Sequence, residues 1–238
     1  MEGGGQVEPS AYRIERFTRM SLFTSLSPLG PAIHMSTNLS PHLDVRMFGA
    51  YFFVNHEYTR SGFNVALNVG FANVGSFADI YLFRKPFRIS PGFLWYNSDR
   101  VRGEFKAQPS AIFTINNVEW HSDNADPVHG LGRLNLGGSG FLLTGGYGRI
   151  LSRSERHFSF PFEAGVAFIN TPKATLNLEG QICNASGTNC ELAINYPGFA
   201  DALSSQLATW NRRFAPYHVY PIVEGGVAYT FQIRRRSE

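Results

Sequence analysis

Apolar residues alternate with small or polar residues along much of this chain. From residue 223 to 231 every odd position is apolar or glycine, whereas the even positions are small or polar and include Glu224. The same alternation covers residues 43–53, 65–71, 87–96 and 158–168. Successive side chains of a strand point to opposite faces, so a period of two predicts β-strands with one apolar face and one polar face.

Weaker segments complete the set of predicted strands, at 14–26, 32–39, 75–83 and 141–151. A bulge is expected before residue 75, because Asp79 would otherwise share a face with Phe71. The pattern predicts a hairpin formed by residues 101–107 and 111–120, and a further strand at 174–182. Polar loops are expected at 55–62, 97–100, 121–132 and 183–216.

One segment has a helical period. Leu203, Leu207 and Trp210 recur at three- and four-residue steps, which predicts an amphipathic helix over residues 200–213, just before the last strand. We expect this helix to cap or partly plug the fold. Together the elements predict a closed, antiparallel, all-β transmembrane barrel of about twelve strands, with eight or ten as alternatives.

Charged positions indicate which face points where. In lipid each charge would cost roughly a few kcal/mol near the midplane. The charges that lie opposite apolar faces are therefore expected to face a lumen, as a pore lining or as an ion-pair plug: Asp44, Arg46, Arg88, Glu163 and Glu224. The apolar positions of the two clearest strands are expected to face lipid: Phe160, Phe162, Val166, Phe168, Val227, Tyr229 and Phe231.

Composition agrees with a barrel and excludes other classes. Mean hydropathy is −0.15, and the chain lacks the apolar run of roughly 18 residues that a membrane helix needs. Aromatic residues make up 14% of the chain, and the net charge of +3 is too small for a nucleic-acid footprint. Arginine far outnumbers lysine, which suits buried ion pairs and equally suits a GC-rich genome.

The two cysteines, Cys183 and Cys190, are separated by turn-forming residues. This spacing predicts a disulfide that closes a surface loop in an oxidising compartment. Residues 1–15 are expected to be a flexible leader, 16–232 the barrel, and 233–238 a basic tail. The first residues lack the basic and apolar regions of a secretory signal, which counts against export.

Candidate chemistry is sparse. His121, Asp123, Asp126 and His129 form a weak candidate metal site, although a solvated loop with turn-forming acids is the simpler interpretation. His56 with Glu57, and Ser122 with His121, fit no catalytic motif. We therefore expect no catalytic residues, no cofactor and no nucleic-acid partner.

Several stretches resemble a family of uncharacterised outer-membrane β-barrel proteins of Gram-negative bacteria, of acidobacterial type. They are residues 39–46 (LSPHLDVR), 85–92 (KPFRISPG), 165–168 (GVAF) with Pro172, the two cysteines, and 220–231 (YPIVEGGVAYTF). The resemblance implies a location in the bacterial outer membrane and a last strand that the outer-membrane assembly machinery reads. That signal usually ends on its aromatic residue, whereas here seven residues follow Phe231. The resemblance implies no substrate.

The function expected from sequence is that of an outer-membrane barrel with a charged polar lumen, serving as a narrow pore or as a structural barrel without catalysis. One alternative is a soluble β-barrel or lectin-like sandwich that binds a small ligand or sugar. A less favoured alternative is a barrel enzyme that acts on lipid or peptide at the outer rim. Outer-membrane lipid is the expected partner, and oligomeric state stays open.

Overall fold

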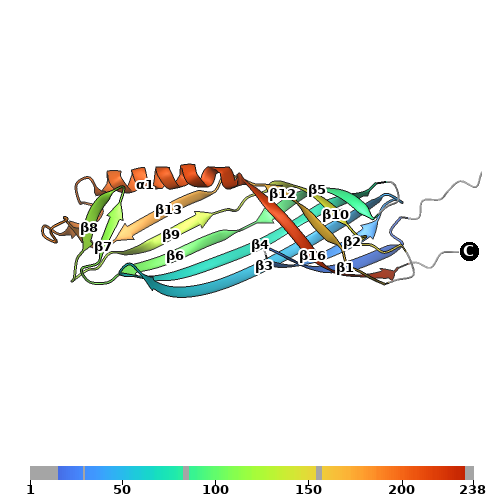
Figure 1. Ribbon diagram of the computed structural model, residues 1–238, viewed down its shortest axis with the longest axis horizontal. Coiled ribbons are helices and arrows are strands. Elements are labelled where there is room, and N and C mark those ends of the chain that lie inside the picture. Colours follow the sequence, from blue (N-terminus) through green and yellow to red (C-terminus); the bar gives the residue numbers. More distant parts are fainter. Residues whose placement is uncertain (1–15, 29, 83–85, 154–156, 234–238) are drawn as a thin grey trace, which may run out of the picture.

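Eight antiparallel strands close into a barrel at one end of an elongated molecule (Figure 1). The computed structural model describes residues 16–28, 30–82, 86–153 and 157–233. In ring order the strands are β1 (Arg19–Ser27), β2 (Gly30–Asn38), β3 (Leu43–Arg60), β4 (Phe63–Tyr81), β5 (Phe87–Asn97), β10 (Gly140–Tyr147), β12 (Phe162–Phe168) and β16 (Val219–Gln232). Pairing of β16 with β1 completes the ring.

An extension projects from the barrel end opposite the C-terminus, because β3 and β4 continue well past their barrel neighbours (Figure 1). Here β4 pairs with β6 (Arg100–Ala107), and β9 (His129–Asn135) and β13 (Lys173–Glu179) follow. A second sheet at the tip contains β7 (Ile112–Ile115), β8 (Val118–Ser122), β14 (Gln181–Cys183) and β15 (Glu191–Leu192). A short strand, β11 (Phe158–Ser159), pairs with β16.

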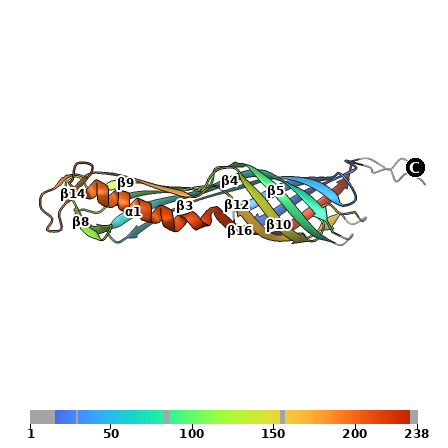
Figure 2. The same ribbon diagram turned by 90° about the horizontal axis from the view of Figure 1, so that it is seen from above.

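The helix α1 (Phe199–Phe214) runs along β13 in the extension (Figures 1 and 2), and the 3-10 turn η1 (Ala215–His218) leads from it into β16. The chain enters α1 through Gly198, whose φ of 77° is left-handed. Asn211 accepts from the backbone N–H of Ala174 at 2.7 Å and donates to its carbonyl at 3.3 Å, so its amide satisfies part of the β13 edge. No helix among the described residues is long and apolar enough to cross a bilayer.

The predicted fold class, a closed antiparallel barrel with one helix before the last strand, is confirmed. The main sheet has twelve strands but only eight of them form the ring, so the barrel has the eight strands of the alternative rather than about twelve. The bulge expected before residue 75 is not present in β4, whose register with β3 is unbroken, so Asp79 and Phe71 share the inward face. The register shift opposite Val74 and Gly75 leaves the extra residue, Trp95, in β5 instead. A Cβ at Gly75 would lie 2.5 Å from the Phe48 ring, which explains the glycine.

Several local predictions were wrong. Residues 55–60 belong to β3 rather than to a loop, because β3 continues beyond the barrel paired with β4, exposed on both faces, so that its polar side chains remain in contact with solvent. The segment 101–107 pairs with β4 and β9 instead of forming a hairpin with 111–120. The connection expected at 97–100 is present between β5 and β6 but is short, and β9 begins inside the expected loop at His129. The helix lies beside β13, not over the barrel mouth.

Candidate functional site in the barrel interior

Two arginines and two acids form a fully buried ion-pair cluster inside the barrel. Arg46 on β3 donates to Glu163 on β12 at 2.9 Å, and its Nε lies 3.2 Å from Asp79 on β4. Arg88 on β5 donates to the same Glu163 at 2.7 Å, and to the carbonyl of Gly148 at 2.5 Å. Each acid faces both guanidinium groups, so the charges balance where water is excluded.

A second polar group lies beside this cluster. The hydroxyl of Ser25 donates to Glu224, whose carboxylate is 2.6 Å from Nε2 of His34. Arg46 approaches Nδ1 of the same imidazole at 3.3 Å. Because arginine only donates, Nδ1 must accept and Nε2 carries the proton that Glu224 accepts. The imidazole therefore links the carboxylate of Glu224 to the arginine cluster.

An apolar layer closes the barrel on the extension side of the charges. Phe48 and Phe77 stack with ring centroids 5.4 Å apart, and the guanidinium of Arg46 lies 4.3 Å from the Phe77 centroid. The buried apolar residues of this layer are Phe77, Leu94, Leu142, Ala167, Ile169 and Ile222. The cavity left among the side chains here is only about 30 Å³, about the volume of one water molecule.

The loop after β10 fills the opposite mouth, near the C-terminus. Ile150 and Leu151 are fully buried there, where the sequence pattern had predicted the end of a strand. Ser21 donates to the carbonyl of Ile150 at 2.8 Å, and the N–H of Ser152 donates to Thr230 at 2.9 Å. The sequence did not predict this plug, because the two apolar residues Ile150 and Leu151 follow a strand and fit the pattern of its continuation.

Each predicted interior charge is buried, but they do not form one group. Arg46, Arg88 and Glu163 meet in the central cluster, and Glu224 reaches it through His34. Asp44 lies nearer the mouth, 3.4 Å from Arg153. Sequence reasoning missed His34 and Asp79. The sequence pattern linked Asp79 only to the expected bulge. Its pairing with Arg46 and Arg88 could not be predicted, because the three residues come from segments far apart in sequence.

The outer surface of the barrel is apolar. Phe160 is 75% exposed and Phe141 67%. The structure places all seven residues predicted to face lipid on this surface, with Val166 the only one half-buried. Contact with lipid itself stays a prediction.

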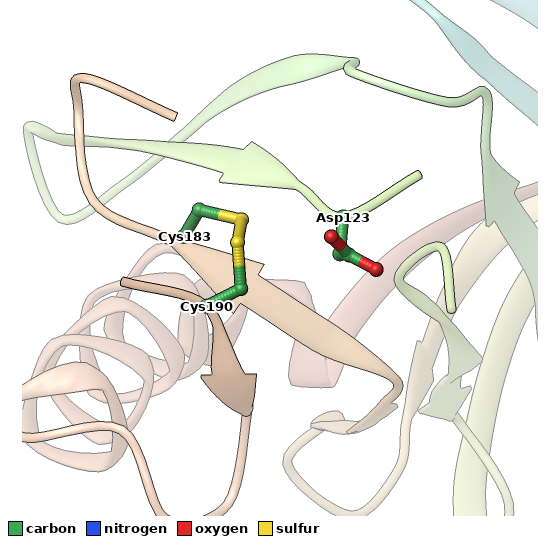
Figure 3. Close-up of side chains that lie close together, drawn as sticks. All are labelled: Asp123, Cys183 and Cys190. Atoms are coloured by element: carbon green, nitrogen blue, oxygen red, sulfur yellow. A yellow bond between two sulfur atoms is a disulfide. The ribbon is translucent and has the colours of Figure 1, made fainter. Parts of the chain in front are cut away.

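The disulfide between Cys183 and Cys190 is formed, at the tip of the extension (Figure 3). Asp123 lies beside it, and these three residues are the one set of possible metal ligands that converges within the described part of the chain. Bonded sulfurs are not thiolate ligands. Asp123 instead accepts from the N–H groups of Asp126 and Ala125, and these bonds lower its pKa. His129 lies 3.6 Å from Glu179, away from this group.

The extension sheet carries an open groove of about 830 Å³ on the face that continues the outer surface of the barrel. It is lined largely by polar side chains, among them Glu57, Asn64, Glu104, Lys106 and Glu179. Asp99 marks the junction between groove and barrel. Its carboxylate accepts from the N–H of Ala72 at 3.1 Å, and burial raises its pKa to about 6.

No protein-family model matches this chain, and no curated protein does. Among solved structures, the crystal structure of CarO from Acinetobacter baumannii is similar, with a TM-score of 0.55 and 13% identity over 89% of this chain and 97% of CarO. The crystal structure of CarO2 from the same organism has a TM-score of 0.57 and 13% identity, over 91% of this chain and 100% of CarO2. At this identity the likeness shows the fold, a closed β-barrel. The acidobacterial part of the resemblance stays a prediction.

Proposed function

We propose that this chain is an outer-membrane β-barrel protein whose barrel is a closed anchor that carries the extension outside the membrane. The observation that carries the proposal is the reversed burial of the barrel. Arg46, Arg88 and Glu163 have no exposed surface, while phenylalanine and other apolar side chains cover the outside. A soluble barrel would bury the aromatic face and leave the charges in water.

The fold supports the same location. This chain shares the closed β-barrel architecture of CarO and CarO2, which supports a barrel of the outer-membrane type. The last strand ends with Tyr229 and Phe231 on the outer surface, the position in which the assembly machinery would read them. Barrels also satisfy every backbone hydrogen bond within the ring, which lipid requires of any spanning structure.

The interior favours an anchor over a narrow pore. Three successive layers obstruct the axis: the apolar layer around Phe77, the arginine cluster, and the loop at Ile150. An eight-stranded barrel is just wide enough for side chains to fill it. No solute path and no catalytic role are assigned to these residues, because each charge is already engaged by a partner.

Insertion and closure are tested separately. The purified full chain is refolded into lipid vesicles and should migrate faster on gels before heating than after it. Refolding only in detergent-free buffer would contradict the membrane location. In planar bilayers the inserted protein should show no steady conductance steps, whereas reproducible unitary steps would make it a pore. Hydrolysis of lipid or peptide by the refolded protein would favour the enzyme alternative.

A further inference from the structure

Four cations gather on the outer face of the extension, where it leaves the barrel. Arg100 and Arg102 come from β6, Arg133 from β9 and Lys173 from β13. Arg102 is directly opposite Arg133, while Arg100 and Lys173 flank Asn135 on either side. Residues opposite each other in paired strands share a face, so these four side chains form one basic patch.

No acid neutralises the basic patch. All four side chains are exposed, and none makes an ion pair within the described residues. The acids on this face, Glu57, Glu104 and Glu179, lie farther along the strands toward the tip and line the groove. Like charges directly opposite on a sheet destabilise it, so the pair Arg102–Arg133 is explained best by an anion that binds between them.

The position of the basic patch relative to the apolar surface identifies the anion. Phe53, Gly70 and Arg100 are in one row across three strands, and Phe53 is one step of about 7 Å beyond Tyr51 on the outer face of β3. Tyr51 and Phe53 are both more than half exposed, as aromatic residues at a membrane interface are. The basic patch therefore begins where lipid headgroups would lie.

The last turn of α1 adds to this charge. Asn211 is hydrogen-bonded to Ala174, the residue after Lys173, so the exposed Arg212 and Arg213 lie near the same end of β13. Cations at a helix C-terminus are favoured by its dipole, but they remain available to an external anion. Most cations of the extension, though not Arg60 and Lys106, thus lie beside the barrel, whereas the acids that line the groove lie beyond them.

We propose that the basic patch binds the phosphate groups of a phosphorylated glycolipid in the membrane leaflet from which the extension emerges. The guanidinium groups of Arg102 and Arg133 would bind one phosphate bidentately, while the acyl chains lie against the apolar barrel surface. This inference rests on the proposed membrane location, and it adds a ligand class and a site.

The test compares two charge-reversed double variants of the full chain in zwitterionic detergent micelles. R102E/R133E removes the centre of the basic patch. R60E/K106E makes the same change in net charge nearer the tip and serves as the matched control. Binding of bisphosphorylated lipid A is measured by native mass spectrometry, with dephosphorylated lipid A and inorganic phosphate as comparison ligands.

R102E/R133E should weaken lipid A binding roughly tenfold to hundredfold, and the control variant less than about threefold, since each cation near a lipid surface contributes about 1 kcal/mol. Equal weakening in both variants, or equal affinity for dephosphorylated lipid, would overturn the inference. Full displacement by millimolar inorganic phosphate would reduce the site to a phosphate site and refute the lipid assignment. Both variants should keep heat-modifiable migration on gels, which shows that their barrels still fold. If the wild-type protein itself failed to insert into membranes, the proposed membrane location would be refuted rather than the phosphate site.

Discussion

The barrel and the extension share β3 and β4, yet β3 buries charged side chains on its inward face within the barrel and is exposed on both faces in the extension. Within the barrel the inward residues of β3 include Asp44 and Arg46, and Met47 points outward. In the extension that inward face carries the exposed Val54, His56, Tyr58 and Arg60, while the outward face carries Asn55, Glu57 and Thr59. The outward face thus changes from apolar to polar between Phe53 and Asn55.

This difference separates two roles of the sequence pattern. Alternation decides that a segment is a strand, whereas the surroundings decide which face is buried. The extension has an ordinary apolar core around Trp120 and Ile182, as in a protein that meets water, and of the two shared strands only β4 packs against it, through Phe63. In the barrel the inward face is charged and paired, as in a protein that meets lipid. The change of polarity after Phe53 therefore marks the predicted membrane boundary.

The largest expected effect tests the buried charges. Glu163→Gln keeps the side-chain volume but leaves Arg46 and Arg88 to share Asp79 alone. Because an unpaired buried charge is poorly solvated, we expect a loss of about 3–5 kcal/mol in the free energy of unfolding. Urea titration of vesicle-inserted protein, followed by the gel shift, measures it. Glu57→Gln, in the exposed extension, should change stability by less than about 0.5 kcal/mol; equal losses would contradict the distinction.

The next prediction tests the boundary within one strand. Met47→Arg places a cation on the outward face of the barrel, and Asn55→Arg places one on the same face of the extension. The first should cost about 2–4 kcal/mol, as arginine does near the bilayer midplane, and the second close to nothing. The same titration measures both. A small cost at Met47 would show that this face does not meet lipid.

The disulfide should stabilise the tip without affecting the barrel. Replacing both cysteines by serine removes the closed loop between Cys183 and Cys190. For a loop this short the chain-entropy estimate is about 2–3 kcal/mol. Hydrogen exchange of β14 and β8 should rise, while exchange in β10 and β12 stays unchanged. Faster exchange throughout the barrel would show that the two regions unfold together.

The smallest effect concerns Asp99 at the junction. Its pKa is raised to about 6 from 3.8, so the folded state binds a proton that the unfolded state releases. The stabilisation is complete below pH 3.8 and is lost as pH rises through 6, giving about 1 kcal/mol more stability at pH 5 than at pH 7. In Asp99→Asn this difference in stability between pH 5 and pH 7, measured by hydrogen exchange of the amides around Ala72, should disappear. The exposed Asp201→Asn should retain it, and a pH-independent wild type would contradict the prediction.

Sequence alone supplied the elements that depend on local patterns. The alternation around Glu163 and the period of Leu203, Leu207 and Trp210 each report one segment. It did not supply pairings between distant segments, such as β5 with β10 or β9 with β13, because alternation carries no partner information. The extension was missed for the same reason. Asn55 and Glu57 looked like a loop until pairing with Asn68 and Ala66 showed that the strand continues.

The pairing of β1 with β16 has a consequence for biogenesis. Leu22 pairs with Tyr229, so the two ends of the sheet meet only after nearly the whole chain has been synthesised. β12 also waits for β16, and Arg46 meets His34 before Glu224 arrives to complete the group. A nascent chain therefore carries two open strand edges and an incompletely paired interior until its final strand docks. Translation that stops before Val219 would yield a product without a ring, whose unpaired strand edges favour aggregation or proteolysis.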